Sequence, residues 1–205
     1  LKEELSLPVA VIYQSRIDNN LRWMQNFADH YQVKLAPHGK TTMTPELFRQ
    51  QQAAGAWAIT LATAPQVVAA VAHGSKRIIM ANQLVGKQNM RLIASVLQDA
   101  SCEFYCLVDS VEQVQQLAAF FSATELTLNV LIEVGVLGGR CGCRDSQQIM
   151  QLADEIARYP SLALAGLEVY EGVIHGEQAE LKIQQFLHDV VASCHTLIER
   201  QAFAL

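Results

Sequence analysis

The sequence has no cluster of lysine and arginine. Its 15 basic residues are outnumbered by 20 acidic ones, which gives a formal net charge of −5. Proteins that bind nucleic acid or an anionic membrane surface usually present a basic patch. We therefore expect neither nucleic acid nor a membrane as a partner of this chain.

Long apolar runs and a secretory signal pattern are also missing. The most apolar stretch, residues 56–72, is interrupted by Pro65-Gln66, so it predicts a strand followed by a helix and not a membrane span. The N-terminal residues LKEELSLPVA lack the basic, apolar and small-residue regions of a signal peptide. These absences favour a cytoplasmic protein.

Cysteine is scarce and odd in number. The five residues are Cys102, Cys106, Cys141, Cys143 and Cys194. A scattered, odd set is typical of a reducing compartment, which again favours the cytoplasm. Cys141-Gly-Cys143 could be half of a metal site, but no second cysteine pair or HxxxH sequence accompanies it. We therefore predict no metal site within the chain.

Two nucleotide-binding patterns are absent. No GxGxxG follows the first strand-like segment, and no GxxxxGK[ST] occurs anywhere. These glycine-rich patterns mark dinucleotide and P-loop sites. Their absence argues against both kinds of fold.

What the sequence does contain is an alternation of short apolar segments and amphipathic stretches. With 51% hydrophobic and 17% charged residues, it is typical of a packed globular protein. The apolar segments are residues 33–38, 56–62, 76–82, 102–109, 127–135 and 162–170. Short, nearly continuous apolar segments are typical of strands buried on both faces of a parallel sheet.

Helices are predicted between these strands by capping signals and apolar spacing. Thr44-Pro45, Ser110 with Gln113, and Asp145 each precede a helical pattern. A further apolar stripe runs through residues 186–198. The order is six consecutive βα units, preceded by a strand at 8–13 and an amphipathic helix from Ile17 to Tyr31.

This order predicts an α/β fold, and within it a (β/α)8 TIM-type barrel, because unit follows unit without a switch point. Only six units are found. A barrel that lacks two strands has two open edges. We therefore expect an incomplete barrel over residues 16–205, with residues 1–15 outside it.

Active sites of such barrels collect at the carboxyl ends of the strands. The side chains at these ends are His38, Lys40, Thr63, Asn82, Gln83, Asp109, Glu133, Arg140, Glu168, Tyr170, Glu171 and His175. A lysine held against an apolar strand end is partly desolvated, which favours the neutral amine that attacks a carbonyl carbon. Carbonyl or Schiff-base chemistry is therefore one hypothesis.

Each of these residues also has an ordinary interpretation. Lys40 could be a solvated surface residue, and Arg140 could cap a turn. Tyr170 could be a core aromatic, His38 could bond a backbone carbonyl, and Asn82 could form a turn. The glutamates could be solvated loop charges.

Five segments together resemble a known family: LAPHGKTTMTPELF (35–48), AAGAWAITLATAPQV (53–67), IIMANQLVG (78–86), GGRCG (138–142) and GLEVYEG (166–172). In this order they resemble the fold-type III pyridoxal-phosphate enzymes, whose barrel is like the N-terminal domain of alanine racemase. The branch indicated contains D-threonine aldolase, D-serine dehydratase and related D-amino-acid deaminases. The resemblance extends from about Leu7 to the end of the chain.

The resemblance implies a role for five residues. Lys40 matches the lysine that holds pyridoxal 5'-phosphate as a Schiff base, and His38 lies beside the cofactor. Arg140 matches the arginine that reaches the cofactor ring, and Tyr170 matches an aromatic residue that lines the pocket. Asn82 lies in a matching stretch at the mouth of the third strand.

The resemblance also implies a longer protein. The strand at 8–13 would belong to a second, mostly β domain completed beyond this chain. The last two barrel strands, with the phosphate-binding loops and the ligands of a possible divalent metal, would follow Leu205. The family further implies a homodimer, in which the second domain of one subunit closes the active site of its partner.

The expected function is that of the N-terminal part of a pyridoxal-phosphate-dependent lyase. Its substrate would be a small D-amino acid with a β-hydroxyl, and the reaction either deamination by dehydration or aldol cleavage. The alternatives are a non-catalytic pyridoxal-phosphate carrier barrel, an amino-acid racemase, and a barrel that forms substrate Schiff bases without a cofactor.

Overall fold

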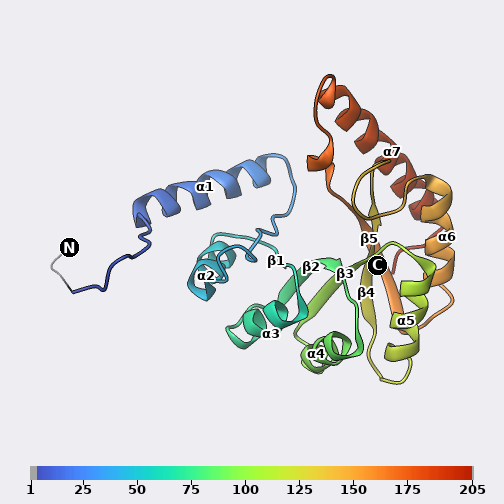
Figure 1. Ribbon diagram of the computed structural model, residues 1–205, viewed down its shortest axis with the longest axis horizontal. Coiled ribbons are helices and arrows are strands. Elements are labelled where there is room, and N and C mark those ends of the chain that lie inside the picture. Colours follow the sequence, from blue (N-terminus) through green and yellow to red (C-terminus); the bar gives the residue numbers. More distant parts are fainter. Residues whose placement is uncertain (1–3, 205) are drawn as a thin grey trace.

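The computed structural model describes residues 4–204 (Figure 1). Residues 1–3 of the predicted segment 1–15, and residue 205 of the predicted barrel 16–205, lie outside the described residues. In chain order the elements are α1 Gln14–His30, α2 Pro45–Ala53, β1 Ile59–Leu61, α3 Ala64–Ala72, β2 Arg77–Gln83, α4 Lys87–Leu97, β3 Glu103–Val108, α5 Val111–Phe121, β4 Leu128–Val134, α6 Ser146–Ile156, β5 Leu162–Val169, the 3-10 helix η1 Glu171–Val173, and α7 Ala179–Glu199. None of these helices has the length and hydropathy needed to cross a membrane.

The five strands form one sheet in chain order, β1-β2-β3-β4-β5, and every pairing is parallel. Helices α3 to α6 lie along one side of this sheet, and the other side is open (Figure 1). Consecutive parallel neighbours joined by helices are the arrangement of a (β/α) barrel, and a doubly wound sheet would reverse its strand order instead. The predicted part-barrel is confirmed.

The first predicted strand, residues 33–38, is not a regular strand. It makes one parallel bridge, between His38 and Thr60. Backbone hydrogen bonds of 2.8 Å flank this bridge, from Gly39 N to Thr60 O and from Thr60 N to Pro37 O, and Leu35 O accepts from the backbone N–H groups of Trp57 and Ala58. Pro37 cannot donate a backbone hydrogen bond, which shortens the ladder. The prediction of a full strand is wrong, although the segment lies beside β1 in the expected order.

Residues 8–13 also form no strand with the described part of the chain. Val11 and Ile12 are 60% and 57% exposed. A strand needs a hydrogen-bonded neighbour, so its assignment to a second β domain stays a prediction. The predicted helix Ile17–Tyr31 is confirmed as α1, which begins three residues earlier, at Gln14.

The main core lies between the sheet and its helices. Along β4, the buried residues Leu128, Val130, Ile132 and Val134 alternate with partly exposed ones. The prediction that strands are buried on both faces is confirmed for β1, whose three residues are all buried, and is wrong for β4, whose side chains on the open face stay partly accessible. The helix caps at Ser110 and Asp145 form as predicted, with backbone N–H groups donating to both side chains.

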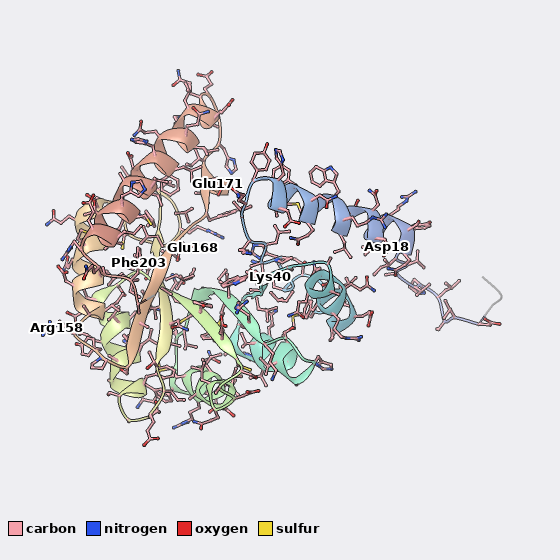
Figure 2. All side chains as sticks on the ribbon, turned by 180° about the vertical axis from the view of Figure 1, so that it is seen from behind. Asp18, Lys40, Arg158, Glu168, Glu171 and Phe203 are labelled. Atoms are coloured by element: carbon pink, nitrogen blue, oxygen red, sulfur yellow. The ribbon has the colours of Figure 1, made fainter. Side chains whose placement is uncertain are left out.

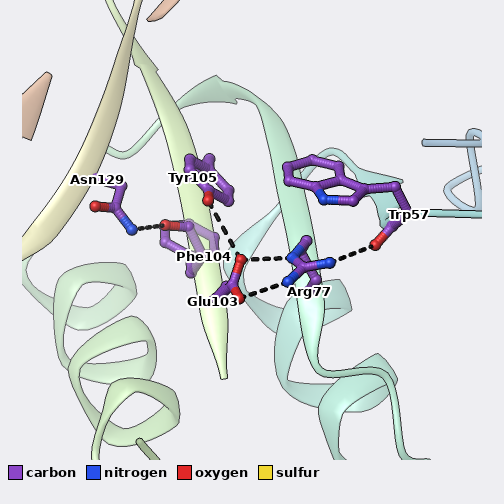
Figure 3. Close-up of polar contacts among 6 residues, drawn as sticks. All are labelled: Trp57, Arg77, Glu103, Phe104, Tyr105 and Asn129. Carbon is purple, nitrogen blue, oxygen red and sulfur yellow. Dashed lines mark hydrogen bonds and ion pairs between the residues drawn. The ribbon is translucent and has the colours of Figure 1, made fainter. Parts of the chain in front are cut away.

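The open face carries a polar network near the amino ends of the strands (Figure 3). Arg77 Nε and Nη2 donate to the two carboxylate oxygens of Glu103 at 2.5 and 2.6 Å. The Tyr105 hydroxyl donates to Glu103 at 3.3 Å, and the Arg77 guanidinium lies 4.8 Å from the ring centroid of Trp57. The charges of Arg77 and Glu103 thus pair with each other at the amino ends of the strands, opposite the carboxyl ends where the site is predicted.

Candidate active site

Lys40 lies at the carboxyl edge of the sheet, two residues after the bridge between His38 and Thr60. Both His38 and Lys40 are exposed, whereas Gly39 between them is buried. A Cβ atom on Gly39 would lie 2.6 Å from the Phe48 ring and 2.9 Å from Ile59 Cγ2. Glycine therefore lets the backbone pass against the core and present Lys40 to the open side.

Arg140 and Tyr170 come together at the same edge, as predicted for two site residues. Arg140 belongs to the loop after β4, and Tyr170 directly follows β5. The guanidinium carbon of Arg140 lies 4.8 Å from the Tyr170 ring centroid, which is a cation–π contact. Tyr170 is 50% exposed. It is therefore not a core aromatic, and one edge of the stack remains accessible to a ligand.

Asn82 has a local structural use. Its amide nitrogen donates to Ala62 O at 3.3 Å, and its side-chain oxygen accepts from the backbone N–H of Gln83 at 3.0 Å. It thus links the ends of β2 and β1. Asn82 remains exposed at the predicted strand mouth, so its contact with a cofactor stays a prediction.

Two glutamates among the predicted strand-end side chains were given no site role, and they lie at this edge on the last two strands of the sheet. Glu133 on β4 and Glu168 on β5 are register partners in neighbouring parallel strands. Gln83 Nε2 donates to Glu133 Oε2 at 2.5 Å. The buried Oε2 atom of Glu168 has no hydrogen-bond partner in the part of the chain that the structure describes. The signal for this pair was their common place near the ends of adjacent predicted strands.

Burial and a neighbouring negative charge raise the pKa of each carboxyl and so disfavour its charged form. Burial raises the pKa of Glu133, and the neighbouring Asp109 charge raises it further. Burial raises the pKa of Glu168 to about 7, with the negative charge of Glu133 adding to the effect. Glu168 can therefore exist as a protonated, hydrogen-bond-donating group near neutral pH.

One edge of the sheet therefore carries a lysine, an arginine–tyrosine stack and a carboxyl whose buried Oε2 atom has no hydrogen-bond partner within residues 4–204. In Figure 2, Lys40 and Glu168 lie at this edge although they come from opposite ends of the sheet. An exposed amine, a fixed cation and a proton-holding acid are the groups that carbonyl chemistry uses. The fold is a parallel (β/α) part-barrel, and the role of Lys40 at its carboxyl edge stays a prediction.

Comparison with known proteins identifies the family. Residues 12–201 match the family described as "Alanine racemase, N-terminal domain". The chain therefore belongs to this family, the barrel domain of the fold-type III pyridoxal-phosphate enzymes.

Individual relatives agree with this family. A D-threonine aldolase from Arthrobacter sp. is 30% identical over 167 residues, which cover 82% of this chain and 44% of the relative. A D-threo-3-hydroxyaspartate dehydratase from Delftia sp. (strain HT23) is 32% identical over 138 residues, which cover 67% of this chain and 36% of the relative. The chain thus spans less than half the length of these two relatives.

The crystal structure of D-threonine aldolase from Filomicrobium marinum has the same fold. It superimposes with a TM-score of 0.85 at 22% identity, covering 94% of this chain and 53% of that one. The superposition supports the part-barrel assignment for nearly all of the chain.

Proposed function

We propose that the protein carrying this chain is a pyridoxal 5'-phosphate-dependent lyase that acts on a small D-amino acid with a β-hydroxyl group. The observation that carries the proposal is the position of Lys40, presented by Gly39 at the carboxyl edge that also holds Arg140 and Tyr170. The names of the two relatives, an aldolase and a dehydratase of β-hydroxy D-amino acids, support the substrate class.

The residues at this edge fit the cofactor. Lys40 offers an exposed amine for a covalent bond to it, and the Arg140–Tyr170 stack offers a cation and a flat aromatic face. The unpartnered Oε2 of Glu168 is a buried polar atom that a ligand group could satisfy. When bound, the cofactor supplies a ring that accepts electrons from the substrate.

Each residue then has a defined task. Lys40 Nζ would hold the cofactor in the absence of substrate, and once released by the substrate amine it would be free to move the proton at the substrate Cα atom. Arg140 directs its positive charge toward the cofactor ring and thereby tunes how much negative charge the ring accepts. Tyr170 holds Arg140 by its ring face, and His38 and Asn82 line the cofactor pocket.

The products of D-threonine test the proposal. Loss of the β-hydroxyl gives a keto acid and ammonia, whereas cleavage of the Cα–Cβ bond gives glycine and acetaldehyde. We expect the purified protein, supplied with pyridoxal phosphate, to form one of these product pairs from a β-hydroxy D-amino acid and not from its L-isomer. Racemisation alone would indicate the racemase alternative, and cofactor binding without any product would indicate the carrier.

Further features of the whole protein remain predictions. They are a homodimer, a cytoplasmic location, a second β domain that includes residues 1–15, and a divalent metal held by residues beyond this chain. The cofactor phosphate would likewise be bound by the last two βα loops of the barrel, where such barrels commonly bind phosphate.

A further inference from the structure

The loop between β4 and α6 carries Arg140 and is built around a second arginine, Arg144. The Arg144 guanidinium donates to three consecutive backbone carbonyls of this loop. The distances are 2.6 Å from Nη1 to Cys141 O, and 3.0 and 3.4 Å from Nη2 to Arg140 O and Gly139 O. One side chain therefore fixes the backbone on both sides of Arg140.

The charge of Arg144 is used for this purpose and not for an ion pair. Within residues 4–204, no carboxylate oxygen lies within 4.0 Å of its guanidinium. A planar guanidinium presents several N–H donors in a fixed arrangement, which suits a set of neighbouring carbonyl oxygens better than a lysine ammonium does. Unpaired loop carbonyls are thereby satisfied without secondary structure.

Backbone hydrogen bonds also hold the two ends of the loop. Gly135 N donates to Cys143 O at 2.9 Å, and Cys143 N donates to Glu133 O at 2.8 Å. Gly142 N donates to Asp109 Oδ2 at 3.0 Å, which links the loop to the end of β3. These bonds close residues 135–143 into a compact turn.

Glycine at position 135 permits the close approach of Arg144. A Cβ atom there would lie 1.9 Å from Arg144 Nη1 and 2.0 Å from Cys141 O. These distances leave no space for a side chain. The guanidinium therefore packs directly on the loop backbone, and the loop conformation depends on it.

We infer that Arg144 is a positioning residue, which holds the loop so that Arg140 lies over Tyr170 at the cofactor site. The inference rests on the proposed function for the role of Arg140, but the loop geometry stands without it. Arg144 needs no contact with substrate or cofactor for this role. Its effect on the reaction passes through Arg140.

Limited trypsin digestion of the cofactor-free protein tests the loop directly. We expect Arg144→Met to speed cleavage after Arg140 by about tenfold, because the released loop opens more often to the protease. Arg91→Met is the matched control, since Arg91 is exposed on α4 and its side chain donates a hydrogen bond to Gln88 on the same helix. Equal cleavage after Arg140 in both variants would overturn the inference.

Activity measurements separate positioning from general stability. Arg144→Met should lower kcat about tenfold in a native background and cause no further loss in an Arg140→Ala background, because both changes remove the same contribution. Additive losses in the double variant would overturn the inference. Arg144→Lys, which keeps the charge but not the planar donor set, should fall between Met and wild type in cleavage and in kcat.

The outcomes also distinguish this inference from the proposed function. A wild-type protein that binds no pyridoxal phosphate would contradict the function, while the digestion still decides whether Arg144 holds the loop. If Arg144→Met shows no thermal unfolding transition and so does not fold, the digestion is done with Arg144→Lys instead. Wild-type cleavage in that variant would overturn the inference.

Discussion

The guanidinium of Arg140 lies over the ring of Tyr170, with its Cζ atom 4.8 Å from the ring centroid. The two residues are 30 positions apart in sequence (170 minus 140) and come from the loops that follow neighbouring strands. An exposed cation–π contact of this kind stabilises by about 0.5–1 kcal/mol. That energy is small for folding but enough to orient a cation toward a bound ligand.

Arg140→Ala should therefore impair the reaction more than the fold. Because the side chain is exposed and loses mainly this contact, we expect the free energy of unfolding to fall by about 1 kcal/mol or less. Turnover should fall about a hundredfold, as the charge beside the cofactor ring is lost. Steady-state kinetics and thermal unfolding, each compared with Arg91→Ala, measure the two effects. Wild-type rate together with an unchanged cofactor absorbance would return Arg140 to the role of a loop cap.

Two variants of Tyr170 separate the contribution of its ring to cofactor binding from that of its hydroxyl. Tyr170→Phe keeps the aromatic face under Arg140, so cofactor binding should weaken less than in Tyr170→Ala, which removes the face entirely. Equilibrium titration with pyridoxal phosphate compares the two variants. Equal affinities in Phe and Ala variants would show that the ring does not hold Arg140 for this purpose.

Glu168 should make stability depend on pH. Its pKa is raised by burial to about 7 in the folded protein, above the ordinary value near 4.5 of an unfolded chain. The unfolded state thus loses its proton first, and the free energy of unfolding falls as pH rises from about 4.5 to about 7. The groups that act on Glu168 are Glu133 on β4, Arg140 on the following loop, and Glu171 on η1.

Glu168→Gln removes this dependence. Thermal unfolding of the cofactor-free protein at pH 5 and pH 7.5 should show a smaller loss of stability in this variant than in wild type. Glu199→Gln, at an exposed position near the end of α7, is the control and should leave the difference unchanged. A Glu168→Gln protein with the full wild-type pH dependence would mean that Glu168 is not the responsible group.

Gly39→Ala should damage both the core and the site. The new methyl group would lie 2.6 Å from the Phe48 ring, so the backbone or the ring must move. Such overpacking costs about 1–3 kcal/mol. Gly166→Ala is a suitable control, because its Cβ would meet only Leu131 Cδ2 at an acceptable 3.4 Å. We expect a lowered thermal midpoint and weaker cofactor binding for Gly39→Ala alone. Equal behaviour of the two variants would contradict the role given to Gly39.

Much of this fold was predictable because its signals are periodic. Apolar spacing identified the strands and helices of the sheet, and the caps at Ser110 and Asp145 formed as expected. The first strand was mispredicted because apolar sequence alone does not provide hydrogen-bond partners. The polar open face was missed because Arg77 and Glu103 compensate each other only once β2 and β3 are paired.

The site was predictable in part. The rule that barrel sites lie at the carboxyl ends of the strands placed Lys40, Arg140 and Tyr170 at one edge of the sheet, and the structure has them there. Their roles toward a cofactor stay predictions. The pairing of Glu133 with Glu168 depends on strand register, which sequence patterns do not specify. The role of Arg144 depends on hydrogen bonds to backbone carbonyls, which residues of any type possess, so the sequence around Arg144 does not specify it.

The central claim is that Lys40 binds pyridoxal phosphate covalently. The most direct measurement is reduction of the cofactor-loaded protein with borohydride, followed by mass spectrometry of its peptides. We predict that residue 40 carries the cofactor in wild type and in Lys34→Ala, an exposed lysine control in the same segment. Lys40→Ala should show neither label nor visible cofactor absorbance nor turnover, and a Lys40→Ala protein that retains absorbance and activity would contradict the claim.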